Sequence, residues 1–116
     1  MTLKEMADLL EAEVISGEEH LDEAFTFAGA SDLMSDVLAF GKPGILMLTG
    51  LANMQSVRTA EIVEAKGIVY VRGRKPSPEG LALARKSSIP IFTTRMLMYK
   101  ASGLLYAAGI PGVGDP

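Results

Sequence analysis

The chain has 116 residues, which suits one domain of ordinary size and leaves no room for a second. It has no cysteine, and this excludes a disulfide framework, a thiolate metal site and a cysteine nucleophile. The single histidine, His20, excludes a multi-histidine metal site, and the net charge of −3 argues against nucleic acid as a partner. No apolar run reaches the roughly 18 residues of a membrane span, so the sequence predicts a cytoplasmic domain with no membrane partner.

Helical and strand patterns alternate along the first part of the chain. Thr2-Leu3-Lys4-Glu5 has the composition of a capping box, and the apolar residues after it recur at helical spacing. Short strands are expected at 13–17 and 24–28, with an acidic surface loop between them at 18–23. A short helix over 33–38 follows.

The second part of the chain repeats strand and helix three times. Strands are expected at 45–49, 67–71 and 89–92, and helices at 53–65, from Ser77 onward, and at 96–107. Because proline cannot donate to a ladder, Pro90 places the last strand at a sheet edge. The alternation predicts an α/β fold in three layers, with a mostly parallel central sheet of about five short strands. We expect one domain over 1–110 and a flexible C-terminal tail over 111–116.

Polar turns follow four of the predicted strands. In open parallel sheets, ligands bind outside the carboxyl ends of the strands, where helix amino ends also present free backbone donors. The candidate ligand-binding residues in these turns are Ser31, Asp32, Thr49, Gly50, Asn53, Arg72, Gly73, Arg74, Thr93 and Thr94. The alternative is that these residues are ordinary helix caps and turns.

Positive charge is concentrated in the segment Arg72-Gly73-Arg74-Lys75, directly after a buried strand. Arginines in such a turn suit bidentate binding of a phosphate or carboxylate, although they would equally suit pairing with neighbouring acids in a solvated turn. The charge is also divided along the chain, because residues 1–36 hold ten of the fourteen acids and residues 65–100 hold eight of the eleven bases. This asymmetry either steers the packing of a partner or second copy, or gives two differently charged faces.

Motifs of established enzyme classes are missing from the sequence. It contains no phosphate loop of the Gly-x-x-x-x-Gly-Lys-Ser/Thr type and no Gly-x-Gly-x-x-Gly, and no serine stands in a nucleophile elbow. Asp32 and Asp36 are four apart and would share a helix face as magnesium ligands, but no third ligand matches them, and the helix dipole explains Asp32 near a helix start. We therefore expect no catalytic residue, no metal and no cofactor, with a small metal-assisted enzyme as the remaining enzymatic alternative.

Three stretches resemble the DRTGG domain and the related amino-terminal domain of HPr kinase/phosphorylase. The first is the opening helix and strand with the loop Gly17-Glu18-Glu19-His20-Leu21-Asp22. The second, residues 28–37, is similar to the Gly-x-x-Ser-Asp-Leu-x-Ser-Asp-Val block of small stand-alone DRTGG proteins. The third, residues 67–106, resembles the closing half of the HPr kinase amino-terminal domain. The contiguous Asp-Arg-Thr-Gly-Gly string is not present.

The resemblance implies a non-catalytic regulatory or sensory domain that self-associates, as a homodimer, and responds to an effector. Combined with the polar turns, it suggests that a nucleotide or other phosphorylated metabolite binds at the carboxyl edge. The arginines would hold the anion, Ser31 and Thr49 would donate hydroxyl hydrogen bonds, and Asp32 would accept one from a ribose or amine. The alternative function is a protein–protein adaptor for a metabolic enzyme, with no small-molecule ligand.

Overall fold

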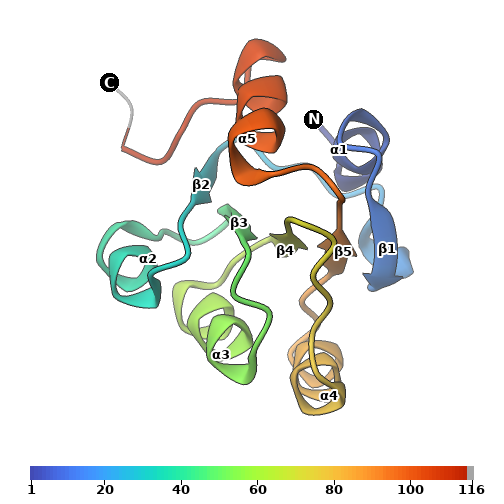
Figure 1. The fold of residues 1–116 in the computed structure, drawn as a ribbon, viewed down its shortest axis with the longest axis vertical. Coiled ribbons are helices and arrows are strands. Elements are labelled where there is room, and N and C mark those ends of the chain that lie inside the picture. The colour runs from blue at the N-terminus through green and yellow to red at the C-terminus, as the bar shows by residue number, and fades with distance from the viewer. Residues whose placement is uncertain (115–116) are drawn as a thin grey trace.

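A five-stranded sheet with helices on both faces forms the centre of the computed structural model, which describes residues 1–114 (Figure 1). The strands are β1 (Glu13–Ser16), β2 (Ala28–Ala30), β3 (Leu46–Thr49), β4 (Gly67–Tyr70) and β5 (Ile91–Thr93), and their order in the sheet is β1-β5-β4-β3-β2. Only β1 is antiparallel to its neighbour. The predicted α/β fold with a mostly parallel sheet of five strands is confirmed.

Helices cover the two faces of the sheet unequally. One face is covered by α2 (Met34–Phe40), α3 (Met54–Val63) and α4 (Pro78–Lys86), and the other by α1 (Leu3–Leu9) and α5 (Met98–Ala107) (Figure 1). A single turn of 3-10 helix, η1 (Glu18–His20), follows β1. None of the helices within residues 1–114 is long and apolar enough to cross a membrane.

The central strands are apolar throughout because both of their faces are buried. Successive side chains of a strand point to opposite faces, so each strand contributes to two separate cores. Leu46, Leu48, Val69 and Val71 join the core under α1 and α5, whereas Ile45, Met47, Ile68 and Tyr70 join the core under α2, α3 and α4. The continuous apolar runs in the sequence follow from this double burial.

The second strand lies later in the chain than the sequence predicted. Residues 24–28 were expected to form it, but β2 begins only at Ala28. The preceding segment pairs with the start of the chain instead: the Phe25 N–H donates to the Met1 carbonyl at 2.9 Å, and Thr2 forms an antiparallel bridge with Ala24. The alternating apolar residues of 24–28 therefore belong mainly to a segment that pairs with the start of the chain and not to a strand of the sheet.

The strand after Pro90 is not at an edge, contrary to the prediction. β5 lies between β4 and β1, and β1 and β2 are the two edge strands. Pro90 directly precedes β5, where its missing N–H is not required by the ladder, and its carbonyl accepts the Ile68 N–H at 3.0 Å. The rule that confines proline to edges holds within a strand, and Pro90 lies just outside one.

The segment after α5 lies along the β2 edge. The carbonyl of Pro111 accepts the Ala28 N–H at 3.1 Å, the Val113 N–H donates to the Ala28 carbonyl at 2.8 Å, and Gly112 forms a parallel bridge with Ala28. The beginning of the expected tail thus pairs with the sheet, while residues 115 and 116 lie outside the described residues.

The one tyrosine hydroxyl of the core connects β4 to α3. The Oη of Tyr70 lies 2.7 Å from the Oγ of Ser56, which in turn donates to the Asn53 carbonyl at 2.7 Å. Because that bond uses the only hydroxyl proton of Ser56, Tyr70 is the donor in the first bond. Burial raises the pKa of Tyr70 above its usual value of 10.0, and the hydrogen bond with Ser56 opposes this shift.

We expect Tyr70→Phe to have two effects: it removes the hydrogen bond to Ser56, and it makes the protein's stability less sensitive to high pH. Because the pKa is raised in the folded protein, Tyr70 ionises at a lower pH in the unfolded chain. The contribution of neutral Tyr70 to the free energy of unfolding is therefore complete below pH 10.0 and is lost as the pH rises further. The variant should lose about 1 kcal/mol at neutral pH and show a weaker dependence of stability on pH above 10. Urea unfolding between pH 7 and 11 measures both, and equal alkaline slopes for the two proteins would contradict the assignment.

Candidate functional site at the carboxyl edge of the sheet

The turns after β2, β3 and β4 meet at one edge of the sheet. The Oδ1 of Asp32 accepts hydrogen bonds from the Gly50 N–H at 2.6 Å and the Thr49 Oγ1 at 3.3 Å. The Oδ2 of Asp32 lies 3.9 Å from the Nη2 of Arg72. The parallel order of the strands thus brings together side chains that are 40 positions apart in the sequence, as predicted for Asp32, Thr49, Gly50 and Arg72.

The turn after β4 has an unusual backbone. Arg72 and Gly73 both have left-handed conformations, with φ of 61° and 69°, and the first of these is uncommon for a residue with a side chain. The N–H groups of Arg72 and Gly73 donate to the carbonyls of Met96 at 2.9 Å and Thr94 at 2.8 Å. The Arg74 N–H donates to Val71 at 3.2 Å. Since these three backbone donors are used within the chain, they are not available to an anion at this turn.

The guanidinium of Arg72 lies across Gly50. It donates from Nη2 to the Gly50 carbonyl at 3.5 Å, and a Cβ placed on Gly50 would come within 2.9 Å of the Arg72 Cζ. Glycine at position 50 therefore allows this close approach, and a side chain there would push the end of Arg72 away. The arginine remains 44% exposed, so it is oriented by Gly50 and Asp32 while still open to solvent.

Other candidate residues reach the same edge with partners of their own. Thr94 Oγ1 donates to the Leu10 carbonyl at 2.7 Å, and Thr93 Oγ1 donates to the Arg74 carbonyl at 2.6 Å. The Asn53 side chain accepts the Ser56 N–H at 3.1 Å and caps α3. Ser31 Oγ accepts the N–H of Leu33 at 3.0 Å. These polar atoms hold caps and turns, and a role for them in ligand binding stays a prediction.

Asp32 and Asp36 do not share a helix face as a pair. The helix α2 begins at Met34 with Leu33 as its N-cap, so Asp32 lies before the helix and Asp36 lies in its first turn. The Asp32 carboxylate is directed to the turn after β3. Among residues 1–114, no three His, Asp or Glu side chains are grouped so that they would hold a metal ion.

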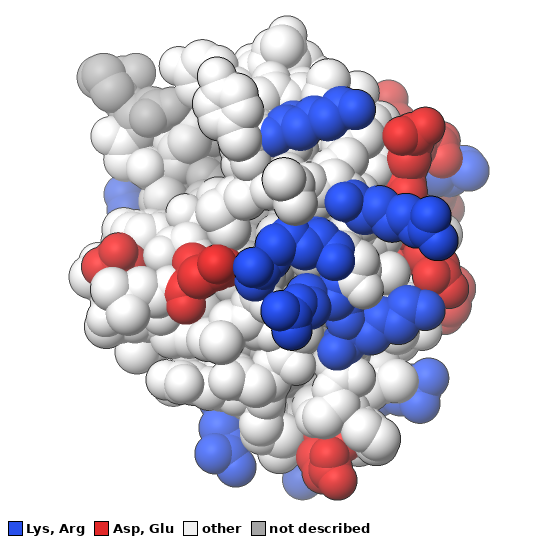
Figure 2. Space-filling model, in the orientation of Figure 1, with Lys and Arg blue, Asp and Glu red and all other residues white. Residues whose placement is uncertain are grey.

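Four exposed cations gather over this edge, and we call Arg72, Arg74, Lys75 and Arg95 the basic cluster. Figure 2 shows lysine and arginine side chains concentrated over the carboxyl ends of the central strands, with acidic side chains to either side. Arg72 pairs with Asp32, and the Nζ of Lys75 lies 3.6 Å from the Glu13 Oε2. Within the described part of the chain, Arg74 and Arg95 take part in no ion pair.

A polar hollow of about 270 Å³ opens beside the basic cluster. Its walls come from the segments that follow α1, β4 and β5. They are formed by Glu11, Glu13, Gly73, Lys75, Thr93, Thr94 and Arg95. Sites that enclose a whole small molecule measure roughly 300–1,000 Å³, so this hollow suits one end of a ligand. Arg95 was not among the residues predicted from the sequence, although its position directly after Thr93-Thr94 at a strand exit would have indicated it.

A second, apolar hollow of about 150 Å³ lies between β2, β3 and α5. Ala30, Leu48, Leu105 and Tyr106 contribute to its walls. The Oγ of Ser102, which also lines it, is buried and has no hydrogen-bond partner among residues 1–114. Nothing in the sequence pattern indicated this hollow, because its walls combine a sheet edge, a helix and the C-terminal segment.

Comparison with known proteins supports the fold. No family model and no curated protein sequence matches the chain. Among solved structures it is similar to the CBS and DRTGG domains of the regulatory region of Clostridium perfringens pyrophosphatase, complexed with the activator diadenosine tetraphosphate. The TM-score is 0.76 at 22% identity, over 90% of this chain and 45% of that chain. This chain thus spans less than half the length of its structural neighbour, and a DRTGG-like fold is consistent with the likeness.

The partners of Thr94 make it a structural residue, and its substitution tests this assignment. In Thr94→Val the buried Leu10 carbonyl loses its donor and the Met96 N–H loses an acceptor at 3.2 Å. The free energy of unfolding should fall by about 1–3 kcal/mol. The exposed Thr26→Val is the matched control and should change stability by less than about 0.5 kcal/mol. Urea unfolding of the two variants compares them, and equal stabilities would refute the structural role.

Proposed function

We propose that this protein is a non-catalytic regulatory domain that binds a nucleotide or another phosphorylated effector at the carboxyl edge of its sheet. The observation that carries the proposal is the basic cluster, in which Arg74 and Arg95 take part in no ion pair with the described residues. Exposed cations that converge from two strand exits provide a binding surface for a polyanion.

Each part of the edge has a distinct role in this proposal. The guanidinium groups of Arg72, Arg74 and Arg95 bind phosphate oxygens, since arginine presents paired donors that match their geometry. Lys75 adds a positive charge beside the polar hollow, which receives one end of the ligand. The free lone pairs of Asp32 accept a hydrogen bond from a ribose hydroxyl or an amino group. The four cations of the cluster outnumber the three acids beside them, Asp32, Glu13 and Glu11, so the edge keeps a net positive charge that favours an anionic ligand.

The structural neighbour gives the proposal its regulatory character. That protein is a regulatory region, and its structure contains a nucleotide activator. We carry this over to the present chain as part of the proposal, together with the relation to DRTGG domains and to the amino-terminal domain of HPr kinase/phosphorylase. We also propose that the domain acts inside the cytoplasm and self-associates as a homodimer.

A protein–protein adaptor without a small-molecule ligand is the second candidate. It is favoured by the large apolar side chains that stay exposed on and beside α5, namely Leu97, Tyr99 and Tyr106. An adaptor for a metabolic enzyme would use that surface and leave the basic cluster empty. The two candidates differ in whether a phosphorylated ligand binds.

Thermal unfolding in the presence of nucleotides, dinucleoside polyphosphates and sugar phosphates tests the proposal. A ligand at about a hundred times its Kd adds about 2.7 kcal/mol to the stability, which raises the Tm by several degrees in a domain of this size. The double variant Arg74→Ala/Arg95→Ala should abolish this rise. Because both side chains are exposed, the Tm without ligand should stay nearly unchanged.

The control variant removes two arginines elsewhere. Arg58 on α3 and Arg85 on α4 are exposed and lie outside the basic cluster, so Arg58→Ala/Arg85→Ala changes the net charge equally. This control should retain the ligand-induced rise. A panel without any rise in Tm would favour the adaptor, and a rise lost equally in both double variants would show non-specific charge attraction.

A further inference from the structure

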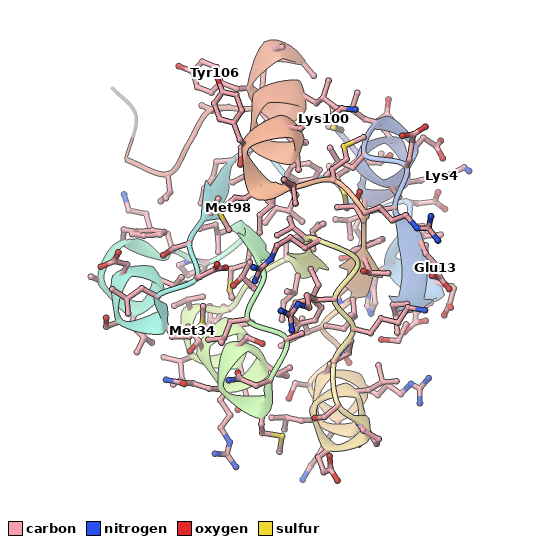
Figure 3. The ribbon with its side chains drawn as sticks, in the orientation of Figure 1. Lys4, Glu13, Met34, Met98, Lys100 and Tyr106 are labelled. Carbon is pink, nitrogen blue, oxygen red and sulfur yellow. The ribbon has the colours of Figure 1, made fainter. Side chains whose placement is uncertain are left out.

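The outer face of α5 is apolar and has no partner among the described residues. Of its ten residues only Ala101 and Leu105 are buried, and Lys100 is its only charged residue. Tyr99 and Tyr106 are 92% and 67% exposed, and Leu97 at the N-cap is 63% exposed. Figure 3 shows Tyr106 projecting from α5 away from α1. An exposed surface that is mostly apolar is typical of one that is covered in an assembly.

Two of the three helices on the other face of the sheet, α3 and α4, carry more charge than α5. The exposed positions of α3 include Arg58 and Glu61, and those of α4 include Glu79, Arg85 and Lys86. On α3 charged side chains share the outer side with Ile62, which is 68% exposed, and on α4 they dominate it. The exposed residues of α5 include the two tyrosines and Gly103, and its one charged side chain is Lys100. Aromatic enrichment together with depletion of charge marks the central part of protein interfaces.

Gly103 gives a second, independent indication on the same helix. It lies in the middle of α5, has no positive φ, and a Cβ added to it would meet nothing within 4 Å. Nothing in the described fold therefore requires glycine, although glycine destabilises a helix interior relative to alanine. Tyr99 and Tyr106 stand four residues before and three after it, so their rings flank a notch on one side of the helix. A notch of this kind allows close approach of another backbone or side chain.

Two hollows adjoin the same surface. One is lined by Tyr99, Gly103, Leu104 and Tyr106, and the other lies between α5 and β2. Both include Ser102 and Tyr106 in their walls, so the Tyr106 ring stands between them. The surface consequently offers projecting rings beside two open hollows, and a self-complementary contact needs both kinds of feature.

We propose that the α5 face, defined by Leu97, Tyr99, Gly103 and Tyr106, is the surface through which two copies of this chain associate. The inference rests on the self-association in the proposed function and names its surface. In an isologous pair the two α5 helices pack on each other, and a tyrosine of each copy enters the notch at Gly103 of the other.

Charge complementarity favours a second copy of this chain as the occupant. Lys100 lies on the side of α5 nearer to α1 (Figure 3), and α1 carries the exposed acids Glu5 and Asp8. Each copy thus carries a cation on α5 and acids on the helix that packs beside it. An apolar centre with charged groups of both signs nearby fits the usual anatomy of an interface.

The area indicates a reversible dimer. Aromatic side chains bury about 150–250 Å² each, so the four tyrosines of a pair contribute roughly 600–1,000 Å². Specific interfaces begin at about 1,200 Å² in total. With Leu97 of both copies added to the tyrosines, the buried area approaches this value. We therefore expect association that depends on protein concentration.

Sedimentation equilibrium between about 5 and 500 µM tests the proposed surface. The unmodified chain should dimerise in this range, and Tyr99→Glu should weaken the dimer at least tenfold. Gly103→Ala should have opposite effects on two readouts, because it raises the Tm of the monomer by favouring the helix but fills the notch and weakens association. The control Ile62→Glu alters a side chain of α3 that is 68% exposed, and it should leave the dimer unchanged.

The outcomes separate this inference from the effector proposal. A monomer at every concentration overturns it, and so does a dimer that resists both Tyr99→Glu and Gly103→Ala. Nucleotide binding by the Tyr99→Glu variant, measured as the rise in its Tm when ligand is added, reports on the basic cluster alone. A dimer disrupted by Tyr99→Glu in a chain that binds no phosphorylated ligand would support the α5 surface and contradict the effector site.

Discussion

The left-handed turn at Arg72 and Gly73 is the constraint on which the arrangement of the edge depends. Its two backbone N–H groups donate to Met96 and Thr94, so the exit of β4 is joined to the exit of β5. The same turn directs the Arg72 side chain over Gly50 toward Asp32, which joins it to the exits of β3 and β2. Four strand exits are thereby held in one arrangement. Strain at a residue with positive φ persists only where the surrounding bonds enforce it.

This constraint divides the polar groups of the edge into two kinds. The backbone donors and the hydroxyls of Thr93 and Thr94 are used within the chain, and they fix the turns. The charged ends of Arg74 and Arg95 are exposed, and they take part in no ion pair with the described residues. A fixed scaffold with free cations is an arrangement suited to binding an anion, because the turns need not be reorganised when the ligand arrives.

The sequence predicted the layers and the converging edge well, because buried parallel strands leave continuous apolar runs and end in polar turns. It failed where a local pattern depends on distant partners. Residues 24–28 alternate like a strand but pair with the chain start, and Pro90 stands beside a central strand just outside its ladder. The hydrogen bond from Thr94 to the Leu10 carbonyl, 84 positions away, could not be predicted from composition or spacing. The exposed apolar face of α5 could not be predicted either. Apolar residues in a helix are expected to be buried, and only the assembled layers show which of them stay exposed.

The proposed function requires phosphorylated ligands to bind at the basic cluster. Amide chemical shifts of the ¹⁵N-labelled chain, followed by NMR during titration with AMP, ADP and ATP in turn, test it most directly. We expect saturable shifts confined to residues 31–32, 49–50, 72–75 and 93–95, with tighter binding as phosphates are added. Saturable shifts centred elsewhere, or none at millimolar nucleotide, would contradict it.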